Sequence, residues 1–200
     1  MKSIRFCSLV AIFVALSGCA SAPAFVKPAP DKLVLGKSTR AEVLQSQQVQ
    51  PFLEQDLNVN NEKAEAITYT AGESPKFWGL LIERRSGTYT VFNDVLVGME
   101  FDSTYDGEST DFNTDKIASI EKGKTTRAEV IALLGKPSGE VLYPIIDDKK
   151  GSGLVYAYTW ARFAGMLTST SSNLLVVSLN ENNIVMKVSF KHNGVEQIKG

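Results

Sequence analysis

The stretch Gly36-Lys37-Ser38-Thr39-Arg40-Ala41-Glu42-Val43 recurs as Gly123-Lys124-Thr125-Thr126-Arg127-Ala128-Glu129-Val130, and this recurrence decides the expected fold. The only difference is a Thr in place of Ser38. A repeat of this length in a chain of 200 residues is the mark of a duplicated structural unit. The sequence therefore predicts two copies of one unit.

Each copy carries the helix-capping motif Thr-x-x-Glu, formed by Thr39 and Glu42 in the first copy and by Thr126 and Glu129 in the second. In such a capping box the Thr hydroxyl accepts a hydrogen bond from the Glu amide, and the Glu carboxylate accepts one from the Thr amide. Both threonines should therefore begin a helix. The second helix should end at Gly135, whereas the first runs into a glutamine-rich stretch and is a degenerate version.

After each helix the apolar pattern changes to the alternation that is typical of β-strands. The expected strands are 66–70, 80–84, 89–92 and 95–101 after the first helix, and 140–143, 154–163, 174–179 and 184–190 after the second. Asn93-Asp94 should form a hairpin turn. We therefore predict the α+β class: two tandem units, each an N-terminal helical segment packed on an antiparallel β-meander.

The units should span residues 33–101 and 117–200, with an acidic polar linker at 102–116 between them. The linker holds Asp102, Asp106, Glu108, Asp111 and Asp115 among Ser, Thr, Asn and Gly residues. A Ca²⁺ loop is the alternative for such a segment, but the acidic spacing does not follow the pattern of a calcium-binding loop. We expect a solvated linker and no bound metal.

The N-terminus reads as a secretory signal over residues 1–18, because Lys2 and Arg5 precede an apolar run that ends at Leu16. That run is shorter than the roughly 20 residues that a membrane-spanning helix needs. Leu16-Ser17-Gly18-Cys19 resembles the bacterial lipobox, which predicts that a lipid becomes attached to Cys19. An ordinary signal with a chance cysteine is the alternative. Residues 19–32 are rich in Pro and Ala, and should form a tether of roughly 30–40 Å.

The pattern that runs from Ile120 through Gly123, Thr126, Glu129, Val130, Leu134 and Gly135 to Pro137 resembles the SmpA/OmlA (BamE) family of lipoproteins. The first copy matches from Leu33 to Val43 only. The resemblance implies a domain similar in fold to β-lactamase inhibitor proteins, which are built from tandem α-β repeats. It also implies an acylated (palmitate-bearing) protein of the bacterial outer membrane that faces the periplasm.

Composition argues against several classes of function. The 21 basic and 22 acidic residues nearly balance, which does not fit a nucleic-acid-binding protein. The one histidine, His192, lies near the C-terminus, and both cysteines lie within the first 19 residues. These residues are too few for a histidine-based catalytic triad or metal site. We therefore expect no enzymatic activity, no catalytic residues and no cofactor.

Tyr156, Tyr158 and Trp160 alternate along one predicted strand, and so share one face of it. Such a ladder either packs inside the protein or forms a partner-binding surface, and the sequence leaves both open. The function we predict is that of a non-catalytic protein-binding or scaffolding module in the envelope, in outer-membrane assembly or integrity, with an envelope protein as its partner. The alternative is an inhibitor-type module that binds a periplasmic enzyme or toxin.

Overall fold

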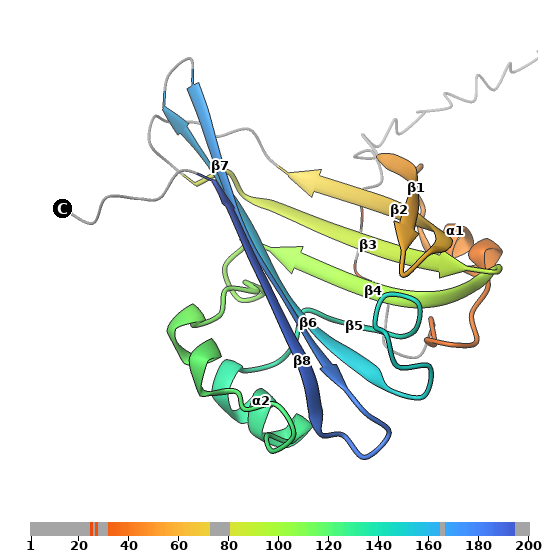
Figure 1. The fold of residues 1–200 in the computed structure, drawn as a ribbon. Coiled ribbons are helices and arrows are strands. Elements are labelled where there is room, and N and C mark those ends of the chain that lie inside the picture. The colour runs from red at the N-terminus through yellow and green to blue at the C-terminus, as the bar shows by residue number, and fades with distance from the viewer. Residues whose placement is uncertain (1–24, 26, 28–31, 73–80, 165–166, 195–200) are drawn as a thin grey trace, which may run out of the picture.

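A single eight-stranded antiparallel sheet forms the body of the protein in the computed structural model, which describes residues 25, 27, 32–72, 81–164 and 167–194. Neighbours in the chain are neighbours in the sheet, so the strands run in the order β1 to β8 (Figure 1). The elements are α1 (Arg40–Ser46), β1 (Leu53–Val59), β2 (Glu62–Gly72), β3 (Arg84–Phe92), β4 (Val95–Ser103), η1 (Thr114–Ser119), α2 (Arg127–Leu134), β5 (Gly139–Val141), β6 (Ser152–Ala164), β7 (Leu167–Leu179) and β8 (Val185–Gly194).

The predicted architecture of two tandem helix-plus-meander units is wrong. The short strand β5 pairs with β4 on one side and with β6 on the other, so the strands after both helices belong to one continuous sheet. The helices are minor elements of seven and eight residues. Sequence reasoning took the duplicated helix start for a duplicated domain, although backbone hydrogen bonds across β5 join the two sets of strands.

The repeated octapeptide forms backbone hydrogen bonds that join each helix start to the second strand of a hairpin, close to its turn. Gly36 donates its amide to the Leu96 carbonyl at 2.8 Å, and the Leu96 amide donates to Ser38 at 2.8 Å. The second copy repeats this geometry on β8, where Gly123 donates to the Val185 carbonyl at 2.8 Å and the Val185 amide donates to Thr125 at 2.9 Å. The duplication therefore encodes a docking motif, in which a capped helix is hydrogen-bonded to the end of a hairpin.

Both capping boxes are present at these helix starts. The Thr39 hydroxyl accepts from the Glu42 amide at 3.3 Å, and the Glu42 carboxylate accepts from the Thr39 amide at 2.7 Å. Thr126 and Glu129 form the same pair of bonds at the same distances. Hydrogen bonding from the Thr126 amide holds the pKa of the Glu129 carboxyl below its usual range.

Removing either cap should weaken the fold modestly. Thr39→Ala and Thr126→Ala are each expected to lower the free energy of unfolding by about 1 kcal/mol, because each leaves a helix-start amide without its acceptor. Urea denaturation measures the change. The exposed strand residue Thr70 provides a control, whose change to Ala should stay within about 0.5 kcal/mol. Unchanged midpoints in both cap variants would contradict the assigned role.

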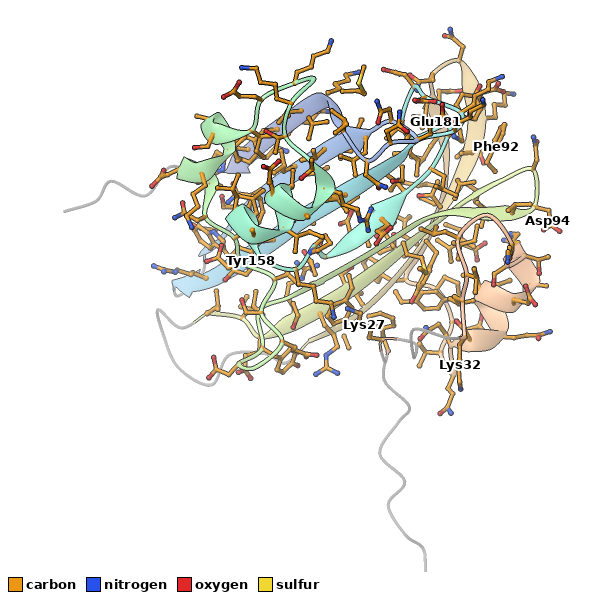
Figure 2. The ribbon with its side chains drawn as sticks, turned by 90° about the horizontal axis from the view of Figure 1, so that it is seen from below. Lys27, Lys32, Phe92, Asp94, Tyr158 and Glu181 are labelled. Carbon is orange, nitrogen blue, oxygen red and sulfur yellow. The ribbon has the colours of Figure 1, made fainter. Side chains whose placement is uncertain are left out.

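Both helices cover the same face of the sheet, here called the helix face. The pairing Tyr89–Met99–Glu140–Leu154 runs across β3, β4, β5 and β6, and these directly paired residues point to one side. Tyr89 packs in the cluster around Val43 of α1, and Leu154 packs in the cluster around Val130 of α2. The two hydrophobic clusters therefore lie side by side on one face, as the view from below shows (Figure 2).

The opposite face, here called the far face, lies on the inside of a curl in the sheet. The Ile82 amide, just before β3, donates to the Ala161 carbonyl of β6 at 2.8 Å, although β4 and β5 separate these strands in the sheet order. A flat sheet would keep β3 and β6 well apart, since neighbouring strands are nearly 5 Å from each other. The sheet must therefore bend so that β3 approaches β6.

The segment 102–116, predicted as a solvated linker, belongs partly to the fold. Asp102 and Ser103 end β4, and both are buried. Phe112 is buried against Tyr156 with their ring centroids 5.6 Å apart. The acidic composition concealed these contacts, because Phe112 is an isolated apolar residue among polar ones.

Candidate functional site

The predicted functional residues lie in three different settings. Cys19 and the signal segment 1–18 fall outside the described residues. Thr39, Glu42, Thr126 and Glu129 stabilise helix starts, as described above. Within the part of the chain that the structure describes, no helix is long and apolar enough to cross a membrane, and no cluster of three His, Cys, Asp or Glu side chains has the arrangement of a metal site.

The aromatic ladder of β6 lies on the helix face and packs inside the protein at its first two members. Tyr156 is 1% exposed, and its hydroxyl donates to the Gly135 carbonyl at the end of α2, at 3.0 Å. Burial raises the pKa of Tyr156 to about 12. Tyr158 packs against the same cluster, whereas Trp160 is only half-buried, with the Arg162 guanidinium 5.3 Å from its ring.

This placement answers the question that the sequence left open for Tyr156 only. Helix α2 covers the aromatic side of β6, and the smaller side chains Val155 and Ala157 lie on the far face. A surface for a partner cannot include Tyr156, because almost none of its side chain reaches solvent. Tyr158 and Trp160 are both partly exposed.

A cleft of about 570 Å³ opens on the helix face between the segment that leads to α1 and the end of α2. Its floor is apolar and consists of Tyr89, Met99 and Phe101. The walls come from Leu33, Val34 and Leu35 on one side and from Ile131 and Pro137 on the other. The volume falls within the range of small-molecule sites in proteins.

The rim of this cleft carries more positive than negative charge. Arg127 is paired with Glu140 at 2.5 Å, but Lys27 and Lys136 have no acidic partner within salt-bridge distance among the described residues. The Lys27 amine lies 4.5 Å from the centroid of the Phe101 ring. Burial and the charge of Lys136 lower the pKa of Lys27, and the charge of Glu108 opposes this shift.

A second polar feature lies on the far face, inside the curl, and is here called the crease: Arg84, Glu100 and Asp102. The Arg84 guanidinium donates to the Asp102 carboxylate and to the Thr159 carbonyl, both at 3.2 Å. It thereby connects β3 to β4 and β6. Burial raises the pKa of Asp102, and the Arg84 charge opposes the shift. The crease therefore holds the curl in place through a partly buried ion pair.

Glu100 makes the stability of the curl depend on pH. Burial, and secondarily the charge of Asp102, raise the pKa of Glu100 to about 7 in the folded protein, from an ordinary value of 4.5. Between these two values the unfolded chain loses this proton more readily, so the contribution of Glu100 to stability falls as the pH rises from about 4.5 to 7. Above pH 7 the loss is complete.

Glu100→Gln should remove this loss. We expect the variant to gain stability relative to the unmodified protein as the pH rises through this window, with the difference constant above it. Thermal unfolding at a series of pH values measures the effect, and the exposed Glu181→Gln is the matched control. If the stability of Glu100→Gln relative to the unmodified protein decreased as the pH rises, the folded protein would instead stabilise the ionised Glu100 carboxylate.

The exposed edge of β1 is the third feature of the surface. β1 is the first strand of the sheet, and its side chains are mostly exposed. Phe52, just before the strand, is 73% exposed, and Leu53 is 44% exposed. An edge strand offers unpaired backbone groups to another chain, and a neighbouring exposed aromatic side chain adds an apolar anchor.

Sequence reasoning missed Lys27, Lys136, Arg84, Glu100 and Phe52. No sequence motif surrounds these residues. Their places in the cleft, in the crease and at the edge of β1 depend on the sheet register and on the position of the segment before α1. One signal was present for the edge, because Phe52-Leu53 precedes a polar stretch whose two central residues Asn60-Asn61 suit a hairpin turn.

Comparison with known proteins assigns no family. No family model matches the chain, and no curated protein matches it. The chain is similar to a solved structure from Streptococcus mutans, described as a "putative beta-lactamase inhibitor protein", with 9% identity and a TM-score of 0.39 over 80% of this chain and 90% of that chain. A likeness at this TM-score is weak and establishes neither a shared fold nor a shared function. None of these comparisons supports the SmpA/OmlA (BamE) resemblance.

Proposed function

We propose that this chain is a lipid-anchored protein of the bacterial outer membrane that faces the periplasm and binds another envelope protein without catalysing a reaction. The observation that carries the binding role is the exposed Phe52-Leu53 pair at the start of the edge strand β1. Burying an aromatic ring that is 73% exposed is a favourable contribution to an interface, and aromatic residues often dominate binding energy.

The mode of binding follows from the position of this pair. The partner contributes an extended segment that pairs with the backbone of β1, and an apolar pocket of the partner receives Phe52. One acidic side chain on β1, Glu54, already has a partner in this chain, since Arg40 bonds to Glu54 and also to Glu65 of β2. The strand therefore offers its edge backbone groups and the apolar Phe52-Leu53 pair as the main contacts for a partner.

A photocrosslinking residue placed at position 52 in cells tests the proposal. We expect it to capture one envelope protein, and Phe52→Asp to abolish co-purification of that protein without altering thermal unfolding. The control places the same crosslinker at Lys122, an exposed residue in the loop before α2. Equal capture at both positions, or none at position 52, would refute binding at β1.

The captured protein decides between scaffolding and inhibition. A membrane protein or a component of outer-membrane assembly supports the scaffolding role. A soluble periplasmic enzyme that loses activity when this chain binds supports the inhibitor-type alternative.

The anchor is tested separately at Cys19. Metabolic labelling with a palmitate analogue should label the unmodified protein, and Cys19→Ser should abolish the label because it removes the thiol that accepts the lipid. Partition of the unmodified protein into the aqueous phase of a detergent extraction would overturn the anchoring proposal while leaving the binding proposal intact.

A further inference from the structure

The cleft between the segment that leads to α1 and helix α2 has the features of a ligand site that the proposed partner binding does not use. It lies on the helix face, bounded by the segment at Leu33–Leu35 and by Ile131 of α2, and β1 is at the edge of the sheet. Three apolar side chains, Tyr89, Met99 and Phe101, form its floor. Apolar floors with a few polar groups at the rim are typical of small-molecule sites.

Two lysines at the rim set the charge of a suitable ligand. The Lys27 side chain lies over the floor, with its amine 4.5 Å from the Phe101 ring centroid. Lys136 lies at the other side of the opening, just after α2. Two acidic residues line the cleft, Glu100 and Glu140. Glu140 is held by Arg127 at 2.5 Å, and the Glu100 side chain points to the far face because its strand neighbours Met99 and Phe101 face the cleft.

Lys27 and Lys136 are both exposed at the mouth of the cleft, and neither has an acidic partner within salt-bridge distance among the described residues. The two like charges repel each other. An anion placed between Lys27 and Lys136 would offset this repulsion and form charge-assisted hydrogen bonds, which are stronger than neutral ones. The same ligand needs an apolar part to cover Met99 and Phe101.

We propose that this cleft binds a free fatty acid, with the carboxylate between Lys27 and Lys136 and the hydrocarbon chain on the floor formed by Tyr89, Met99 and Phe101. This site is independent of the edge of β1.

Titration calorimetry with decanoate, below its micelle concentration, tests the proposal on a chain that begins at Ala20. This chain lacks the signal and the acylated cysteine, so no covalent lipid competes, and it keeps every residue that the structure describes. We expect saturable binding of decanoate, and movement of the Met99 methyl signal in NMR spectra upon binding. Butanoate should bind at least tenfold more weakly, because it covers little of the floor.

Charge and site are tested by ligand and protein variants. Decyltrimethylammonium, which reverses the charge of the head group, should not bind. Lys27→Met and Lys136→Met should each weaken decanoate binding about tenfold, the usual effect of one charged hydrogen bond. Lys122→Met, outside the cleft, should leave the affinity unchanged. Circular dichroism confirms that the variants fold.

Several results would overturn the proposal. The first is a lack of decanoate binding, and the second is an unchanged affinity for decanoate in a variant that combines Lys27→Met with Lys136→Met. Equal binding of decyltrimethylammonium would show an apolar groove without charge selection. Retention on phosphatidylglycerol vesicles without decanoate binding would show recognition of a lipid surface in place of a free fatty acid.

Discussion

Gly139→Ala is expected to destabilise the protein by more than about 3 kcal/mol, beyond the usual cost of adding one methyl group to a packed core. A Cβ at this position would lie 1.9 Å from the Met99 carbonyl oxygen and 2.7 Å from the Glu100 Cα. Both atoms belong to the backbone of β4, so no side-chain rotation relieves the clash. The strands must separate where β5 joins β4.

The site of the clash makes the effect large. β5 has three residues, and its pairing of Gly139 with Glu100 and with Val155 joins β4 to β6. Loss of this pairing separates the strands that follow α1 from the strands that follow α2. Natural domains of this size have only about 5–15 kcal/mol of stability, so the variant should unfold at markedly lower temperature or urea concentration.

Gly107→Ala is the matched control. Gly107 has a φ of 82°, and a Cβ there would meet no atom within 4 Å, so only the backbone strain of about 1–2 kcal/mol applies. If Gly139→Ala and Gly107→Ala unfold at the same midpoint, the close approach of β5 to β4 does not limit the stability of the sheet.

The sequence predicts those parts of this fold that local chemistry determines. Thr39 and Thr126 begin helices because a hydroxyl and a carboxylate three residues apart satisfy helix-start amides. Asn93 and Asp94 form the β3–β4 turn with φ values of 50° and 65°, a conformation that these residue types tolerate. Each of these features depends on a few neighbouring residues.

Features that depend on distant contacts escaped prediction. β1 was missed because an exposed edge strand needs no apolar alternation, and most of its side chains face solvent. The expected strand began at Leu174, whereas β7 begins at Leu167 and pairs with β6 along its whole length. The joining of all strands into one sheet depends on the close approach at Gly139, which has no signature beyond a single glycine.

The tether gives the clearest example of a contact that composition concealed. Residues 19–32 read as a spacer because proline and alanine dominate the segment. Phe25 is nevertheless 1% exposed and stacks on Tyr69, with ring centroids 5.9 Å apart and an angle of 14° between the rings. Phe25, six positions after Cys19, is thus already part of the folded body, so at most about 20 Å of chain can separate it from Cys19, in place of the expected 30–40 Å.

Phe25→Ala should therefore lower the free energy of unfolding by about 3–5 kcal/mol, the usual cost of removing a buried Phe side chain. The ring lies between Tyr69 and Phe101 and fills the space above Gly87, where an added Cβ would come within 2.4 Å of the ring. A flexible spacer would tolerate the same change without loss. Urea denaturation measures the difference, with the exposed Phe52→Ala as the control for loss of a Phe ring.

Gly87→Ala tests the same contact from the opposite side. The new methyl group should displace the Phe25 ring, so Gly87→Ala alone should destabilise the protein, and the double variant should lose less than the sum of the two single losses. Additive losses would mean that Phe25 and Gly87 act independently. If Phe25→Ala lowered the free energy of unfolding by less than about 1 kcal/mol, the segment would act as a spacer. The folded body could then lie farther from the proposed lipid anchor.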